Sequence, residues 1–279
     1  MRSYLDMVDY VLKNGQLKDN RTGIKTLSVS GYMFRHNMSE GFPLLTSKKI
    51  KPENVFSELE FFIKGITSKK WLQERNNHIW DEWCSPEIIP YSTDPKVQER
   101  MREEDYLGPI YGSQWRNFNG DGYDQLKNLI DTIKTNPESR RMIVSAWNPA
   151  KLDKMALPPC HVMFQILINT TTKKMDLIWY QRSCDLMLGI PYNIASYACL
   201  LCLIAKETGY TPNELIGSFA DLHIYENHIE KAKIQLQRPT HPLPQIEFEN
   251  FTSIFDWKYE DTKILNYEHE GFIKFPVAV

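Results

Sequence analysis

Apolar side chains recur at helical spacing in four stretches of the chain. The first places Tyr4 and Val8 on one face and is followed by Gly15, a residue type that commonly ends helices. The second begins at Pro52, which suits a first helical turn, and the third is stopped by Pro137. The pattern predicts helices over residues 4–13, 52–64, 126–133 and 227–237.

Five runs rich in β-branched and aromatic residues favour strands instead. They are Thr26–Phe34, interrupted at Gly31, and residues 142–147, 161–169, 175–183 and 215–222. Before the last run, residues 194–205 are apolar nearly all round, which predicts a buried central helix. This order of elements predicts a mixed α+β domain, with helices packed on an antiparallel or mixed sheet.

Residues 84–106 differ from their surroundings. They contain three prolines and the charged run KVQERMREED, which predicts a solvated surface insertion. No internal repeat, low-complexity tract or Gly/Ser linker divides the chain. We therefore expect a single domain over residues 1–279 that carries this insertion.

Composition narrows the class of protein. The 279 residues carry 33 Lys and Arg against 35 Asp and Glu, so net charge offers no drive for binding nucleic acid. No apolar run reaches the ~18–20 residues of a membrane span, and the N-terminus does not have the pattern of a signal peptide. The five cysteines are odd in number and lack metal-ligand spacing. We expect a cytoplasmic protein with free thiols and no metal.

Cys160 is a candidate nucleophile. It follows Pro158 and Pro159 directly before a predicted strand, and the two prolines stiffen the approach to the thiol. A thiol becomes nucleophilic when nearby cations or backbone donors lower its pKa. A single cysteine is more often a small buried apolar residue, so Cys160 alone does not establish catalysis.

Further polar residues stand beside the apolar runs. Arginines on predicted loops and strand ends would form a phosphate site if they converged, and would otherwise be surface charges. These arginines are Arg21, Arg140, Arg141 and Arg182. Asn193 begins the apolar helix, where its amide could cap the helix or pair with the O4/N3–H edge of uracil. Alternation places Asp221, His223 and Tyr225 on one strand face.

Nine stretches, taken in order, identify a family. They are DNRTG (19–23), GFPLLTSKK (41–49), HIWDEW (78–83), LGPIYGSQWR (107–116), SRRMIVSAWNP (139–149), MALPPCH (155–161), QRSCDLMLGIPYNIASYA (181–198), DLHIYENH (221–228) and PVAV (276–279). Together they resemble the thymidylate synthase family over nearly the whole chain. The resemblance implies one α/β domain around a large mixed sheet flanked by helices, paired sheet to sheet in an obligate homodimer.

The resemblance also implies a reaction, the reductive methylation of dUMP to dTMP. The cosubstrate 5,10-methylenetetrahydrofolate would give both carbon and hydride and leave as dihydrofolate. Cys160 would attack uracil C6 as a thiolate and make C5 nucleophilic. The other nucleotide contacts would be Arg21, Arg182 and Ser183 on the phosphate, Arg140 and Arg141 of the partner subunit on the same phosphate, Asn193 on uracil, and His223 and Tyr225 on the ribose.

Proton transfer and folate binding are implied in the same way. Glu58 would relay protons through water to uracil O4 and the folate, supported by Tyr111, His161 and Gln165, and Asp185 would bind the pterin. The implied folate surface consists of Ile79, Trp80, Trp83, Leu157, Leu188, Gly189, Tyr192, Val277 and Ala278. The C-terminal residues would close over the complex, because hydride transfer must compete with attack by water.

Departures from the family pattern leave a second product open. They are Glu60-Phe61 in place of Leu-Trp, Ile66 and Ser68 in place of the Asp and Asn of a Gly-Asp-Thr-Asn turn, Tyr192 in place of Phe, and Ala220 in place of Gly. The Glu-Leu-Glu run and Asp221-Leu222-His223 also resemble phage nucleotide hydroxymethylases, in which water attacks the methylene, and the Tyr192 hydroxyl could hold such a water. The alternative is a dUMP hydroxymethylase; Trp80, Trp83 and the C-terminal lid favour the synthase.

A third hypothesis is that the fold serves RNA recognition. The full candidate catalytic set and the lack of a strongly basic face weigh against RNA binding as the sole function.

Overall fold

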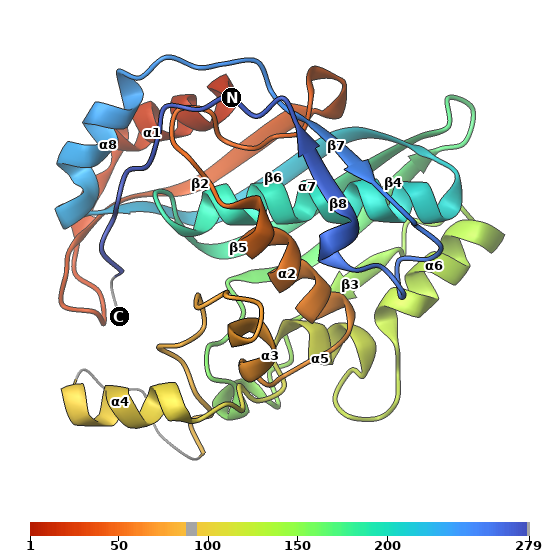
Figure 1. Cartoon of the computed structure of the whole chain (residues 1–279), viewed down its shortest axis with the longest axis horizontal. Coiled ribbons are helices and arrows are strands. Elements are labelled where there is room, and N and C mark those ends of the chain that lie inside the picture. Colours follow the sequence, from red (N-terminus) through yellow and green to blue (C-terminus); the bar gives the residue numbers. More distant parts are fainter. Residues whose placement is uncertain (88–93, 278–279) are drawn as a thin grey trace.

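A six-stranded mixed sheet forms the centre of the computed structural model, which describes residues 1–87 and 94–277 (Figure 1). Its strands are β1 Gln16–Lys18, β2 Thr26–Asn37, β3 Ile143–Ser145, β4 His161–Asn169, β5 Lys174–Asp185 and β6 Thr211–Tyr225. They lie in the order β1-β2-β6-β5-β4-β3; β5 and β6 are parallel and the other neighbours antiparallel. A separate hairpin pairs β7 Gln245–Phe248 with β8 Thr262–Leu265. The predicted mixed sheet is confirmed.

The helices are α1 Arg2–Asn14, α2 Pro52–Ile63, α3 Lys70–Gln73, α4 Pro95–Glu103, α5 Tyr111–Arg116, α6 Gln125–Thr135, α7 Gly189–Thr208 and α8 Ile229–Leu236. Helices α1, α6 and α7 pack directly against the strands and cover one face of the sheet, and α4 lies apart from it (Figure 1). Short 3-10 turns are η1 Met38–Glu40, η2 Leu152–Lys154, η3 Glu226–His228 and η4 Tyr259–Asp261. The predicted helices over residues 4–13, 52–64 and 126–133 are confirmed as α1, α2 and α6, whereas residues 227–237 divide between η3 and α8.

Helix α7 joins the parallel strands β5 and β6 and forms the middle of the core. Every residue from Ile194 to Ala205 is buried, as the apolar run predicts. Gly209 ends the helix with a φ of 75°, a left-handed conformation that glycine adopts without strain. By length and composition this helix could cross a membrane, but most of it is buried within the protein, which is typical of a core helix.

Strand β2 is longer than the sequence predicts. Gly31 has a φ of 79°, yet Ser30 and Tyr32 on either side still pair with β6. The predicted interruption is therefore a local change within a continuous strand that runs on to Asn37. The long β2–β6 ladder places the start of β2 next to the end of β6. The turn that precedes β2 therefore lies close to the end of β5 and the start of β4.

The segment 84–106 contains α4, which lies at the lower left of Figure 1. Asp94 begins this helix by accepting a hydrogen bond from the Lys96 amide at 2.8 Å. Most of α4 is exposed, but Met101 is buried with Cys84 in a cluster separate from the main core, and the partly buried Val97 packs against it. Residues 88–93 lie outside the described part, and the extent of the insertion stays a prediction.

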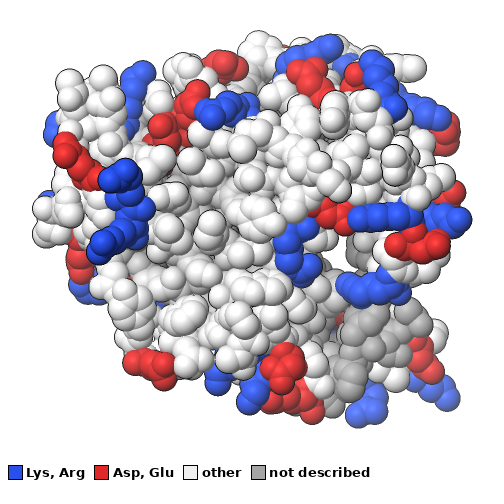
Figure 2. Space-filling model, turned by 180° about the vertical axis from the view of Figure 1, so that it is seen from behind, with Lys and Arg blue, Asp and Glu red and all other residues white. Residues whose placement is uncertain are grey.

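The sheet face opposite the helices is largely apolar. Four large apolar side chains on its strands are exposed, namely Met33, Ile143, Met163 and Tyr180. Figure 2 shows the molecule from this side, with a broad area free of charged side chains and Lys, Arg, Asp and Glu gathered mainly toward its rim. An apolar face of this kind is typical of a surface that another protein covers.

Candidate active site

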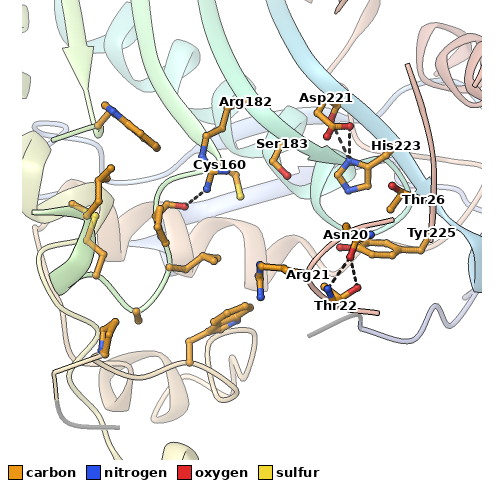
Figure 3. A pocket seen from close by; sticks show the side chains of 18 of the residues that line it. Asn20, Arg21, Thr22, Thr26, Cys160, Arg182, Ser183, Asp221, His223 and Tyr225 are labelled. Carbon is orange, nitrogen blue, oxygen red and sulfur yellow. Dashed lines mark hydrogen bonds and ion pairs between the residues drawn. The ribbon is translucent and has the colours of Figure 1, made fainter. Parts of the chain in front are cut away.

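A pocket of about 750 Å³ opens where β4, β5 and β6 meet the turn that precedes β2 (Figure 3). This volume suits a small-molecule ligand. Its wall brings together Cys160 before β4, Arg182 and Ser183 on β5, and His223 and Tyr225 on β6. The strands thus place residues that are far apart in the sequence around one space.

Cys160 is half-buried at the floor of this pocket. Its backbone N–H donates to the Tyr111 hydroxyl at 2.8 Å, and its carbonyl accepts from the Arg182 amide at 2.8 Å. Burial raises the pKa of the thiol, while the positive charges of Arg182 and Arg21 lower it. The arginines therefore lower the thiol pKa as expected, but desolvation outweighs them and the net shift in the single chain is upward.

The two prolines before Cys160 orient Arg182. The guanidinium donates from Nε to the Pro159 carbonyl at 2.9 Å and from a terminal nitrogen to the Pro158 carbonyl at 2.8 Å. The same group lies 5.5 Å from the centre of the Trp147 ring. The Pro-Pro pair therefore supplies fixed acceptors that hold a cation beside the thiol, as well as a stiff approach to it.

Arg21 reaches the pocket from a turn that its neighbours build. The Asn20 side-chain oxygen accepts from the backbone and the hydroxyl of Thr22 at 2.8 and 2.7 Å, and its amide donates to the Ile24 carbonyl at 2.7 Å. This is the local hydrogen bonding typical of an Asx turn. The turn lies beside Tyr225 at the end of β6 and borders the same pocket (Figure 3).

Three polar side chains of β6 point to the same side, as the alternation predicts. Asp221 accepts from the Lys18 ammonium at 2.5 Å and the Ser28 hydroxyl at 2.6 Å, and its carboxylate lies 3.4 Å from the His223 ring. Burial alone would raise the pKa of Asp221, but hydrogen bonds from His223, Lys18 and Ser28 hold it well below its usual range. Asp221 is therefore a fixed negative charge that orients its neighbours.

Asn193 sits inside α7, where the Gln181 amide donates to its side-chain oxygen at 3.0 Å. The helix N-cap is Leu188, so the interpretation of Asn193 as a helix cap is wrong. Gln181 also donates to the Ser183 carbonyl and accepts from the Trp179 indole. This chain of amides fixes the orientation of Asn193 next to the strand that carries Ser183.

Glu58 is a buried carboxyl on α2. It accepts from the Trp80 indole at 2.8 Å, and burial, only partly opposed by this bond, raises its pKa to about 7. A carboxyl that titrates near neutrality suits proton transfer. Glu60 points elsewhere, because it pairs with Lys64 and accepts from the Tyr259 amide at 2.8 Å.

Tyr111 and His161 stack behind Cys160 with ring centres 4.1 Å apart. His161 is hydrogen-bonded to the Tyr197 hydroxyl at 2.8 Å, and burial lowers its pKa to about 3. The imidazole is therefore neutral at physiological pH. It can orient a hydrogen-bond network beside Glu58 but adds no charge to it.

The comparisons with known proteins agree with this geometry. A sequence model described as thymidylate synthase matches residues 2–279. The thymidylate synthases of Mycoplasma genitalium and Mycoplasma pneumoniae are 45% and 44% identical to this chain, and both alignments cover the whole of each protein. The chain belongs to the thymidylate synthase family.

The structure places some of the site residues implied by the family resemblance on the pocket wall. Among the predicted residues, the wall includes Arg21, Trp83, Leu157, Cys160, Arg182, Ser183, His223 and Tyr225. Buried behind or beside it are Glu58, Trp80, Tyr111 and His161. Asp185 accepts from the amides of Met187 and Leu188 at 3.0 and 3.1 Å at the start of α7, near Gly189 and the half-buried Tyr192.

Other predicted residues lie away from this wall. Arg140 and Arg141 are exposed and do not line it, and the Gln165 amide donates to the Arg140 carbonyl at 2.9 Å. Ile79 is exposed, Val277 is 61% exposed, and Ala278 lies outside the described residues. In the described ranges, no three His, Cys, Asp or Glu side chains gather as metal ligands.

Several residues of the site carry no predicted role. They are Lys18, Asn20, Thr22, Thr26, Trp147 and Gln181. The Asn-Arg-Thr-Gly sequence is a signal for an Asx turn and could have identified Asn20 and Thr22. The Lys18–Asp221 pair joins residues that are distant in the sequence, so only the strand register places them together.

Proposed function

We propose that this pocket performs the reaction of the thymidylate synthase family, the reductive methylation of dUMP to dTMP. The cosubstrate is 5,10-methylenetetrahydrofolate, which gives carbon and hydride and leaves as dihydrofolate. The observation that supports this most is the position of the Cys160 thiol beside the guanidinium of Arg182, with Arg21 and the polar face of β6 around the same space.

The nucleotide would bind along the strand ends. Arg21, Arg182 and Ser183 would hold its phosphate, with Arg140 and Arg141 of the partner subunit adding two more cations. His223 and Tyr225 would take the ribose hydroxyl, since Asp221 fixes His223 from behind. The cations of the partner would also favour the thiolate of Cys160, which the single chain disfavours.

Proton transfer would run on the α2 side of the pocket. Glu58 would exchange a proton through water with uracil O4 and the folate, because its raised pKa lets it both give and accept one near neutrality. Tyr111 and His161 would order that water network, and Gln165 would support it indirectly by holding the backbone of Arg140. Asn193, fixed by Gln181, would read the uracil edge.

The folate would lie against the loop and helix residues beside Trp83. This surface would consist of Ile79, Trp80, Trp83, Leu157, Leu188, Gly189 and Tyr192, with Asp185 on the pterin and Val277 and Ala278 closing over it. Exclusion of water by the closed tail would protect the methylene intermediate from hydrolysis.

A second copy of the chain would cover the open face of the sheet. The apolar side chains Met33, Met163 and Tyr180 on that face, and the exposed Arg140 and Arg141 near its edge, support a homodimer. Mixing Cys160→Ser and Arg141→Ala proteins after partial unfolding tests this. If the site is shared, hybrid dimers recover activity that neither variant has alone; no recovery would count against a shared site.

The hydroxymethylase alternative finds less support. Glu60, the residue that suggested it, is tied to Lys64 and to the Tyr259 amide and not to the pocket wall. Tyr192 is half-buried and does not line the pocket wall, which leaves its hydroxyl less suited to hold an attacking water. RNA binding would be at most a second role, and the chain would act in the cytoplasm.

Turnover with dUMP and methylenetetrahydrofolate tests the proposal directly. We expect dihydrofolate, followed by its absorbance, to form one-for-one with dTMP, identified by mass. Hydroxymethyl-dUMP without dihydrofolate would instead establish the alternative reaction.

A further inference from the structure

Lys69 carries a buried ammonium group outside the pocket. The residue has no solvent exposure, and its Nζ donates to the backbone carbonyls of Asp81 at 3.0 Å and Trp83 at 2.7 Å, and to the carbonyl of Met101. An ammonium has three protons to donate, so these three acceptors satisfy it fully. Burial of a charge is tolerated only with such compensation.

The three carbonyls belong to two different parts of the chain. Asp81 and Trp83 lie in the loop that presents Trp83 and Pro86 to the pocket. Met101 lies in the last turn of α4, where carbonyls lack partners within the helix and a cation also stabilises the helix dipole. Lys69 therefore joins one wall of the pocket to the C-terminal end of α4.

Contacts around Lys69 strengthen this connection. Its backbone N–H donates to the Asp105 carbonyl at 2.8 Å, and the Ser68 hydroxyl donates to the Asp105 carboxylate at 2.9 Å. Arg102 on α4 pairs with Glu82 of the loop at 3.2 Å. Ser68 is one of the departures from the family turn, so this departure accompanies the attachment of the 94–106 segment.

We propose that Lys69 is a positioning residue that holds the folate-side wall of the pocket against α4. This inference rests on the proposed function, because the substrate on that wall would be the folate. The α4 segment then helps to set the position of Trp83 and Pro86, although none of its own residues lines the pocket.

The variant Lys69→Met tests the proposal, because it keeps the side-chain length and removes the ammonium. Lys70→Met is the matched control, since Lys70 is the next residue and is exposed. We expect Lys69→Met to raise the KM for methylenetetrahydrofolate by about tenfold to a hundredfold and to leave dUMP affinity within about twofold of wild type. Lys70→Met should change neither.

Limited trypsin digestion gives a readout independent of catalysis. Lys96, Arg100 and Arg102 on α4 are exposed cleavage sites, so Lys69→Met should be cut there several-fold faster than wild type. Lys69→Gln, which retains two amide donors, should fold readily and give intermediate values. It keeps the test valid if the methionine variant does not fold.

Three results would overturn the role of Lys69. They are an unchanged KM for the folate in both variants, an equal loss of affinity for dUMP, and unchanged digestion of α4. Calorimetry of dihydrofolate binding in the presence of dTMP distinguishes a failure of the Lys69 proposal from a failure of the proposed function. A wild-type protein that binds no dihydrofolate overturns the folate assignment, whereas undiminished binding by Lys69→Met overturns only the role of Lys69.

Discussion

The two sides of the pocket, which we propose bind the nucleotide and the folate and name accordingly, are built differently. On the nucleotide side, Arg182, Ser183, His223 and Tyr225 stand on the paired strands β5 and β6. On the folate side, Trp83 and Pro86 stand on a loop that the buried ammonium of Lys69 and ion pairs such as Arg102–Glu82 help to hold in place. Strand ladders fix many side chains at once, whereas the loop depends on a few individual polar contacts.

This difference predicts which changes each side of the pocket can accept. A change in a strand register would move every residue of the nucleotide side to the wrong face. The folate side can accept a segment such as 94–106, provided that new contacts fix the loop again, as Lys69 and Ser68 do. Variants on the two sides should therefore differ in which substrate they affect.

The largest effect is expected from Cys160→Ser on the nucleotide side. Removal of the nucleophile should lower kcat by a factor on the order of 10⁴ or more, while dUMP binding, measured by calorimetry, stays close to wild type. Cys202→Ala is the matched control, because Cys202 is buried in α7 away from the pocket. Substantial turnover by Cys160→Ser would remove it from the reaction.

Glu58→Gln should have the next largest effect. Loss of the proton carrier should lower kcat by about 10²–10⁴-fold and remove the ionisation near pH 7 from the pH–rate profile. Glu60→Gln removes a neighbouring buried carboxylate that does not line the pocket, so its kcat should stay near that of wild type. A normal pH profile in Glu58→Gln would contradict the proposed role.

The same variant should change stability with pH. The pKa of Glu58 is raised from 4.5 to about 7 in the folded protein, so ionisation costs stability as pH rises through this interval, by about 3 kcal/mol above it. Glu58→Gln should therefore exceed wild type in stability most at pH 8 and lose this advantage below about pH 4.5. Urea unfolding at several pH values measures the difference, and a constant difference would contradict the burial argument.

Asp221→Asn should have a smaller and more selective effect. Without the carboxylate, Lys18 loses its ion pair and His223 its fixed orientation, so the KM for dUMP should rise by about tenfold while the KM for the folate stays within about twofold. Steady-state kinetics with each substrate varied in turn separates the two. An equal rise in both would show that the sides are not independent.

Tyr192→Phe should have the smallest effect. Its side chain is half-buried on the proposed folate side and does not line the pocket wall, so kcat and the product should change less than about twofold. Mass analysis of the nucleotide decides whether the hydroxyl matters for the product. A switch in the ratio of dTMP to hydroxymethyl-dUMP would revive the alternative reaction.

The fold and the nucleotide side could largely be predicted from the sequence. The run from Ile194 to Ala205 predicts the core helix, and the alternation along β6 places His223 and Tyr225 together, because both patterns are local. The predicted interruption of the strand at Gly31 is wrong, because the long β2–β6 ladder accommodates the unusual φ of this glycine. The order of the motifs along the chain identifies the family. It does not predict the pKa of Cys160, because that pKa depends on how deeply the folded chain buries the thiol.

The folate side resisted prediction for the same reason. Lys69 reads as one of two adjacent surface lysines, and nothing local distinguishes it from Lys70. Its burial follows from Met101 and Trp83 approaching from elsewhere in the chain. The position of Arg140 and Arg141 away from the pocket wall is not predicted by local sequence either, because the phosphate that we propose they bind lies in the site of the partner subunit.

The five cysteines differ in solvent exposure, and this difference determines which of them oxidants can attack in the folded protein. All five cysteines are described, none forms a disulfide, and four are buried. Cys160 alone is partly exposed, so peroxide would oxidise its sulfur first, to a sulfenic acid with release of water, at a rate limited by the raised pKa of the thiol. At that stage the protein would be inactive but still folded, and a thiol reductant would restore it without refolding, whereas further oxidation to the sulfinic acid would be irreversible.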